Sequence, residues 1–176
     1  LNKPQLSENI GACARAMKNF NFSNLIIIDP KPSFPNDKIF ATSVGAKEII
    51  KNSKLYNKFE ESLSNFDYLI ATTSRFRNKN INHINLNDLK KLDFNKRIGF
   101  IFGSEASGLS NHEISYVNCT MNIPASKNFK SLNLSHSLII IAQCVSSIIN
   151  SKLSLFKKSS KVKSATKNEI VAMSNL

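Results

Sequence analysis

Short apolar runs that alternate with helical patterns predict an α/β fold, in which a mostly parallel sheet is flanked by helices. Three runs are typical of buried strands, at residues 25–28, 68–71 and 97–102. Helical periodicity is clearest at residues 134–156, where apolar residues recur every three or four positions. A length of 176 residues fits one main domain and a tail.

Polar, proline and glycine residues divide the first half of the chain into elements. Ser7 is expected to cap a first helix that ends near residues 19–21. After the first strand, residues 31–37 contain prolines and predict a loop. Residues 40–50 are expected to be helical, with an interruption at Gly45.

The same alternation continues through the second half of the chain. Short polar segments again separate the helices and strands, as expected for repeated βα units. In order, the expected elements are a helix carrying Phe59, Leu63 and Phe66, the strand at 68–71, a polar loop to Asn85, a short helix at 86–92, the strand at 97–102, a helix capped by Ser110, a strand closing at 121–123 and the long helix at 134–156.

The composition changes sharply after the long helix. Residues 157–176 are rich in lysine and serine and poor in apolar residues, which predicts a basic linker. Residues 170–173 could begin a helix of a C-terminal appendage, and residues 1–4 are typical of the end of a strand whose beginning lies upstream. We therefore expect one folded domain over residues 1–156.

The chain is strongly basic. It contains 24 Lys and Arg residues against 12 Asp and Glu residues, a formal net charge of +12. Such an excess favours a polyanionic partner such as nucleic acid, although richness in Lys and Asn can also reflect the base composition of a genome. Compact basic runs occur at Arg75, Arg77 and Lys79 and at Lys127 and Lys130.

Cysteine usage and hydropathy predict a cytoplasmic protein. Cys13, Cys119 and Cys144 are widely spaced and form no C-x-x-C pair, which favours small core thiols in a reducing compartment over disulfides or a zinc site. His83 and His112 have no metal-site spacing, and no metal is expected. No apolar run approaches the roughly 20 residues that a membrane helix needs, and no membrane partner is expected.

A glycine-bracketed loop, FGSEASGL at residues 102–109, follows an apolar strand. Gly103 and Gly108 let the chain turn sharply, and ligands of open α/β sheets lie at the carboxyl ends of strands. The spacing matches a phosphate-binding loop except that Leu109 replaces the lysine, and Glu105 would repel phosphate. The loop therefore argues against nucleotide hydrolysis and predicts a less anionic cofactor.

Two further motifs accompany this loop, NIGACARAMKNF at residues 9–20 and SLNLSHS at residues 131–137. In order and spacing, the three motifs resemble those of the SPOUT superfamily of RNA methyltransferases. Within it, ATTSR at residues 71–75 and the first motif are most similar to the TrmJ-type tRNA 2′-O-methyltransferases. The resemblance implies S-adenosylmethionine as cofactor and methylation of the ribose of nucleotide 32 in the tRNA anticodon loop.

The resemblance also implies an architecture that pattern reasoning does not supply. The SPOUT fold contains a C-terminal deep trefoil knot, although chain connections in proteins are in general unknotted. It further implies an obligate homodimer, because the cofactor pocket of one subunit is completed near the RNA-facing surface of the other. We therefore expect a homodimer that acts on tRNA or another structured RNA.

Individual residues take expected roles from the three motifs. Arg15 matches the residue next to the reactive ribose, and because arginine stays protonated, we expect it to bind the adjacent phosphate and stabilise the developing alkoxide. Ser131 and Asn133 match positions that orient the ribose and tether the knot, and Asn133 is expected to stabilise the helix entry. The residues expected to bind RNA are Arg15, Arg75, Arg77 and Lys79. The expected cofactor contacts are Thr72, Thr73, Ser74, Gly103, Ile123, Lys130, Ser131 and Leu132.

Departures from the TrmJ-type pattern leave the target open. Those proteins often carry arginine where this chain has Ser104 and Ala106-Ser107, and Lys130 occupies a position that is usually small. Glu105 is expected to accept hydrogen bonds from loop amides, and His136 is expected to have no chemical role. The alternatives are a SPOUT methyltransferase for another tRNA or rRNA nucleotide, or a non-catalytic RNA-binding or cofactor-binding module of the same fold.

Overall fold

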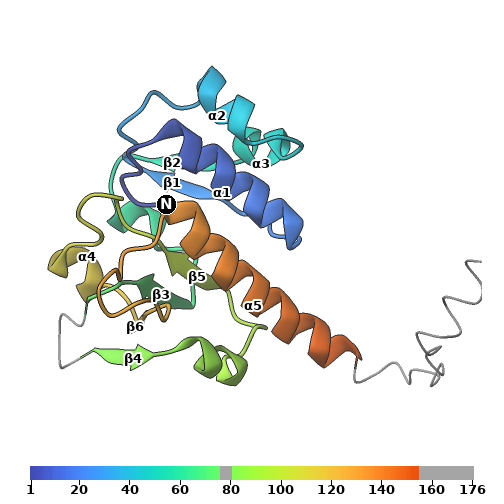
Figure 1. Ribbon diagram of the computed structural model, residues 1–176, viewed down its shortest axis with the longest axis vertical. Helices are drawn as coiled ribbons and strands as arrows, with labels where there is room; N and C mark the ends of the chain where they lie inside the picture. The colour runs from blue at the N-terminus through green and yellow to red at the C-terminus, as the bar shows by residue number, and fades with distance from the viewer. Residues whose placement is uncertain (76–80, 155–176) are drawn as a thin grey trace, which may run out of the picture.

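The strands of the protein form two parallel sheets. The computed structural model describes residues 1–75 and 81–154. Within these residues one sheet has the order β1-β2 and the other β4-β6-β3-β5, and every strand pair is parallel (Figure 1). The strands are β1 Ile26–Ile28, β2 Lys54–Tyr56, β3 Tyr68–Thr72, β4 Asn82–Ile84, β5 Ile98–Ile101 and β6 Cys119–Met121.

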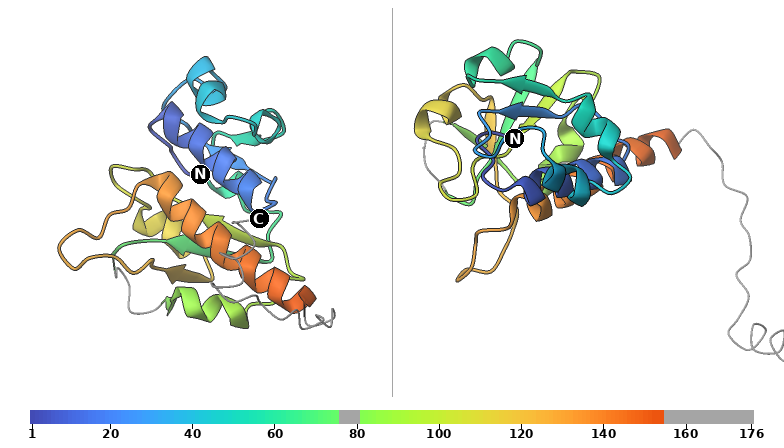
Figure 2. Two further views of the ribbon diagram at one scale, coloured as in Figure 1. Left: turned by 45° about the vertical axis from the view of Figure 1, so that its right-hand side comes forward. Right: turned by 90° about the horizontal axis from the view of Figure 1, so that it is seen from above.

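Helices cover the sheets. The longest two, α1 and α5, lie side by side on one face, and α2 packs on the outer side of α1 (Figures 1 and 2). This arrangement confirms the predicted α/β class with a mostly parallel sheet flanked by helices. The α-helices are α1 Ser7–Asn19, α2 Asp37–Thr42, α3 Lys47–Lys51, α4 Asn111–Ser115 and α5 Leu134–Ser154, and the 3-10 helices are η1 Glu60–Ser62 and η2 Leu86–Lys91.

The first residues of the chain join the two sheets. The amide of Ile28 donates to the carbonyl of Leu1, and the amide of Lys3 donates back to the carbonyl of Ile28. On the other side, the amide of Asn2 donates to the carbonyl of Phe102 at 2.8 Å. This short segment therefore runs between β1 and the end of β5, as a strand end would.

The apolar core lies between the helices and the sheets. Ile10, Cys13 and Ala14 of α1 are fully buried, and they belong to the same cluster as Ile141 and Val145 of α5. The helical spacing of these residues places them on one face of each helix. Their burial explains why the apolar periodicity of the sequence located both helices.

Most of the element predictions are confirmed. Ser110 caps α4, since its hydroxyl accepts from the amide of Glu113 at 3.2 Å and the Glu113 carboxylate accepts from the amide of Ser110 at 2.7 Å. Gly45, with φ of +74°, separates α2 from α3 as expected. Residues 155–176, which include the predicted basic linker, lie outside the described residues.

Other predictions are wrong. Ser7 is the first residue of α1 and not its cap; its hydroxyl instead accepts from the Asn36 side chain at 2.9 Å. The predicted helix over Phe59, Leu63 and Phe66 is reduced to the three-residue η1. The strand expected to close at 121–123 ends at Met121. β2 and β4 are additional strands, in segments that lack an apolar run.

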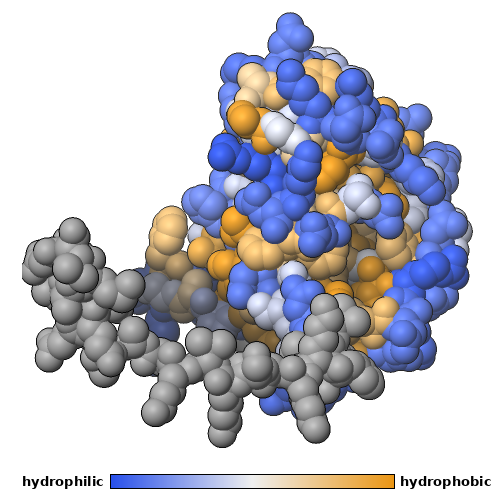
Figure 3. Space-filling view, turned by 90° about the vertical axis from the view of Figure 1, so that its right-hand side faces the viewer, coloured by the Kyte–Doolittle hydropathy of each residue, from blue (hydrophilic) through white to orange (hydrophobic). Residues whose placement is uncertain are grey.

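α5 also departs from the expectation that no apolar run is long enough for a membrane. By length and composition alone, residues 134–151 of α5 could cross a membrane, which is weak evidence because core helices meet the same criteria. Only 28 % of this window is buried. Figure 3 shows the side of the molecule toward which α5 runs. Apolar side chains lie in the centre of this side, and polar side chains surround them.

A buried carboxylate links the first residues to α4. Glu113 is 6 % exposed; its Oε1 accepts from the Asn2 side chain at 2.8 Å and lies 3.4 Å from Lys3 Nζ. Burial by itself raises the pKa of Glu113, but the hydrogen bonds from the Ser110 amide and from Asn2, with the charge of Lys3, outweigh burial. The pKa of Glu113 therefore lies below its ordinary value.

This lowered pKa predicts a pH-dependent contribution to stability. We expect Glu113→Gln to lower the free energy of unfolding by about 1–2 kcal/mol at neutral pH. The contribution is present above the ordinary glutamate pKa of 4.5 and is lost as the pH falls through the lower pKa of the folded protein. Urea denaturation of both proteins across this range checks it, and a difference that does not shrink in acid would contradict it.

Candidate active site

A cavity of about 360 Å³ opens at the carboxyl ends of β3, β5 and β6. The chain segments that follow these strands form its walls, as expected for a ligand site of a parallel sheet. The start of α5 closes it. Its lining consists of Thr72, Thr73, Ser74, Arg75, Phe102, Gly103, Ser104, Glu105, Ala106, Ser107, Gly108, Met121, Ile123, Lys130, Ser131, Leu132, Leu134 and Ser137.

Hydrogen bonds hold the strand ends around the cavity together. The Thr72 hydroxyl donates to the carbonyl of Ile101 at 3.0 Å, and the Thr73 amide donates to the carbonyl of Met121 at 2.9 Å. The Thr73 hydroxyl accepts from the amide of Arg75 at 3.1 Å, which turns the chain after β3. The polar run after β3 thus shapes one wall of the cavity.

The glycine-bracketed loop folds back on itself. The amide of Gly108 donates to the carbonyl of Ser104 at 2.8 Å. A Cβ atom at Gly103 would overlap the backbone of Gly108 and Leu109, and Gly108 has φ of +68°, a conformation that favours glycine. The Ser104 hydroxyl is buried at this wall and has no hydrogen-bond partner among the described residues.

Three side chains connect the three sequence motifs. Glu105 accepts from the amide of Gln5 and from the Asn9 side chain, each at 2.8 Å. The Asn9 side chain accepts in turn from Asn133 Nδ2 at 2.9 Å, and Asn133 Oδ1 accepts from the Ser135 amide at 2.8 Å. The Glu105 carboxylate also lies at the positive end of the α1 dipole. The motifs therefore meet where α1 and α5 begin.

Comparison with known proteins shows the family to which the chain belongs. Residues 1–143 match the profile of the SpoU rRNA methylase family. The chain belongs to the SpoU rRNA methylase family. This membership confirms the resemblance of its motifs to RNA methyltransferases.

Several relatives of this chain carry the name TrmJ. The chain is 36 % identical over 146 residues to the tRNA (cytidine-2′-O-)-methyltransferase TrmJ of Methanocaldococcus jannaschii, and the match covers 80 % of this chain and 63 % of the relative. The crystal structure of TrmJ from Z. mobilis superposes with a TM-score of 0.80 at 25 % identity, over 98 % of this chain and 73 % of that one. The chain thus spans less than two thirds of the curated relative.

A more distant structure shares the fold alone. AviRb of Streptomyces viridochromogenes, described as a SpoU methyltransferase in complex with the cofactor AdoMet, superposes with a TM-score of 0.68 at 19 % identity. The superposition covers 85 % of this chain and 59 % of AviRb. This likeness supports the parallel-sheet architecture of the chain.

All the residues expected to contact the cofactor line the cavity described above. They reach it from three different strand ends and from the segment before α5: Thr72, Thr73, Ser74, Gly103, Ile123, Lys130, Ser131 and Leu132. The sequence did not single out Phe102, Met121, Leu134 or Ser137. Ser137 follows Leu134 by one helical turn, a spacing that could have placed both on the cavity side of α5.

The residues expected to act on the ribose are not gathered in one place. Ser131 lines the cavity, whereas Asn133 caps α5 and contacts Asn9, in keeping with its expected place at the helix entry. Arg15 is exposed on α1 and does not line the cavity. Within one chain, these side chains therefore form no common site.

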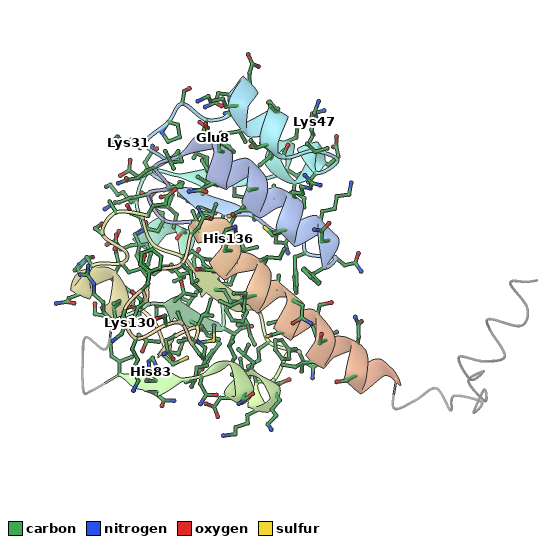
Figure 4. All side chains as sticks on the ribbon, in the orientation of Figure 1. Glu8, Lys31, Lys47, His83, Lys130 and His136 are labelled. Carbon is green, nitrogen blue, oxygen red and sulfur yellow. The ribbon has the colours of Figure 1, made fainter. Side chains whose placement is uncertain are left out.

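The basic and histidine residues are separated as well. Arg75 lines the cavity, while Arg77 and Lys79 lie outside the described residues. Lys130 lies on the loop before α5, His136 at the start of α5 and His83 on β4 (Figure 4). His83 contacts Thr120 Oγ1 at 2.9 Å and Asn122 Oδ1 at 3.1 Å. No cluster of metal-ligating side chains occurs among the described residues.

Replacing Glu105 with glutamine tests the link between the motifs. Glutamine keeps the size of the side chain but turns one acceptor oxygen into a donor nitrogen. Either the Gln5 amide or the Asn9 side-chain amide therefore loses its acceptor. We expect the free energy of unfolding to fall by about 1–3 kcal/mol, measured by chemical denaturation. Glu61→Gln, which makes the same charge change at an exposed position, is the control. Equal effects of the two substitutions would contradict a structural role for Glu105.

Proposed function

We propose that the protein transfers a methyl group from S-adenosylmethionine to a ribose 2′-hydroxyl of tRNA. The observation that carries this proposal is the cavity at the three strand ends, because the residues that the motifs imply for the cofactor all line it. Family membership and the TrmJ relatives support the reaction class. AviRb, which binds AdoMet on the same fold, supports the cofactor.

The cavity wall suits S-adenosylmethionine. A volume of about 360 Å³ lies within the usual range of small-molecule sites. Ile123 and Leu132, which are partly exposed, offer an apolar surface for the adenine ring, and Thr72, Thr73 and Ser74 carry hydroxyl groups in the same lining. The buried Ser104 hydroxyl, which lacks a partner among the described residues, provides a free polar group at the wall.

The residues of the chain bind the RNA, orient the reacting ribose and stabilise the negative charge that develops on it. When bound, the cofactor supplies a sulfonium methyl group, which the ribose 2′-oxygen attacks as the carbon–sulfur bond breaks. Ser131 at the cavity rim orients the ribose. Arg15 binds the adjacent phosphate and stabilises the developing alkoxide, and the hydroxyl proton passes to a phosphate oxygen or to water.

A homodimer explains how Arg15 reaches the reaction. Arg15 lies outside the cavity of its own chain, so a second copy would have to present its α1 to this cavity. Two apolar side chains that remain exposed, Leu6 directly before α1 at 52 % and Ile139 on α5 at 37 %, support such an interface. We also propose the deep trefoil knot of the SPOUT fold and, from the tRNA substrate and free cysteines, a cytoplasmic location.

The target nucleotide is proposed as position 32 of the anticodon loop, by similarity to the TrmJ-type enzymes. The alternatives are ribose methylation of another tRNA or rRNA nucleotide, or RNA binding without turnover. Ser104 and the Ala106-Ser107 pair stand where TrmJ-type proteins often have arginine. This difference supports the first alternative, a different target nucleotide. The last alternative predicts no cofactor binding.

Calorimetric titration with S-adenosylmethionine tests the site. We expect one cofactor per chain for the unmodified protein and none for Ala106→Trp, because a bulky ring at this exposed position of the cavity lining fills the space. Ala41→Trp, at an exposed alanine of α2 outside the cavity, is the matched control and should bind normally. Binding that survives in Ala106→Trp would place the cofactor elsewhere.

A further inference from the structure

We propose that Phe129 stacks on an unpaired base of the RNA substrate, beside the nucleotide whose ribose enters the cavity. The inference rests on the proposed function and adds a residue that positions the RNA. It comes from the loop at residues 122–133. This loop joins β6 to α5 and projects from the body of the molecule (Figure 2).

The Phe129 ring is unusually exposed. With 76 % of its surface accessible, it is the most exposed large apolar side chain among the described residues, ahead of Val44 at 58 %. The Phe129 amide donates to the carbonyl of Ser126 at 3.2 Å, and the Ser126 hydroxyl accepts from the Asn128 amide at 3.3 Å. A hydrogen-bonded turn therefore presents the ring to the solvent.

The charges around the ring match RNA. Lys127 and Lys130 flank Phe129, both are exposed, and neither forms an ion pair with a carboxylate within the part of the chain that the structure describes. An aromatic ring between cations is the arrangement that binds single-stranded nucleic acid, since the ring stacks on a base while the cations contact phosphates. An apolar protein partner would leave both charges unpaired.

The position of the ring matches the reaction. Phe129 directly precedes Lys130, Ser131 and Leu132, all of which line the cavity. Arg75 lines the same cavity from the end of β3 and adds a cation there. Proteins commonly recognise unpaired loop nucleotides by splaying out their bases and stacking them on aromatic rings. Beside the cavity, the Phe129 ring is placed to replace the stacking partner that such a base loses.

Equilibrium binding of a fluorescently labelled tRNA transcript tests the proposal. We expect Phe129→Ala to weaken binding about tenfold, and Phe129→Trp to bind within about twofold of the unmodified protein, because indole preserves the stacking surface. Val44→Ala, which removes exposed apolar surface elsewhere, should have no effect. Lys127→Ala should weaken binding. It should also reduce the slope of the logarithm of the binding constant against the logarithm of the salt concentration by about one.

Two further measurements separate this role from others. Calorimetry should give the same S-adenosylmethionine affinity for Phe129→Ala as for the unmodified protein; a loss would place the ring on the cofactor. Sedimentation should give the same mass; a smaller mass would place the ring at an interface between two copies. Either result would overturn the proposal, as would unchanged tRNA binding by Phe129→Ala. Failure of the unmodified protein to bind tRNA would instead overturn the proposed function itself.

Discussion

Replacing Arg15 with alanine is expected to slow methyl transfer about 100- to 1000-fold, the usual cost of losing a group that stabilises negative charge in the transition state. Binding of S-adenosylmethionine should be unchanged, because Arg15 is exposed on α1 and lies outside the cavity. Single-turnover methylation of tRNA and calorimetry measure the two effects separately. Methylation at the unmodified rate would contradict the role given to Arg15.

Two controls sharpen this result. Lys18→Ala removes a positive charge from an exposed position of the same helix and should reduce the rate much less. Mixed dimers of Arg15→Ala with Ala106→Trp should recover activity, because one of the two sites then combines an intact cavity with the Arg15 of the other copy. Without any recovery, Arg15 would have to act on the cavity of its own chain.

Replacing Gly103 with alanine is expected to destabilise the protein and to disrupt the cavity wall. The new Cβ would overlap the backbone of Gly108 and Leu109, so the loop that forms one cavity wall must shift. Overpacking of this kind costs about 1–3 kcal/mol and sometimes more, and we expect cofactor binding to be lost with it. Thermal denaturation and calorimetry measure the two consequences.

Gly108→Ala provides the comparison for this prediction. At Gly108 a Cβ meets nothing within 4 Å, and only the left-handed backbone conformation is unfavourable. This strain costs about 1–2 kcal/mol, so Gly108→Ala should be the milder variant in both measurements. The reverse order of the two variants would contradict the geometry given for the loop.

Elements with a strong local signal were predictable from the sequence. The buried strands β3 and β5 lie within apolar runs, and the Ser110 cap of α4 is encoded within four residues. In contrast, Lys54 and Leu55 of β2 are exposed, and β4 consists of Asn82–Ile84. These two strands depend on pairing with β1 and β6, which no local pattern reveals.

The residues of the cavity could be anticipated from the sequence, whereas the contacts between the motifs could not. The family resemblance, and not a local pattern, named the eight residues expected to contact the cofactor, and all of them line the cavity. The motifs also suggested a structural role for Glu105. The path from Glu105 through Asn9 to Asn133 spans more than a hundred residues of sequence and required the folded structure. The segment before α5 contributes Phe129, whose exposure likewise has no counterpart in the sequence pattern.

Ribose methylation of tRNA by this protein is tested most directly by mapping the transferred methyl group. The protein is incubated with bulk tRNA and S-adenosylmethionine labelled on its methyl group, and the tRNA is digested and analysed by mass spectrometry. We expect the label on a ribose 2′-oxygen, at nucleotide 32 of the anticodon loop. Label on a base, or no label in any tRNA while the cofactor binds, would contradict it.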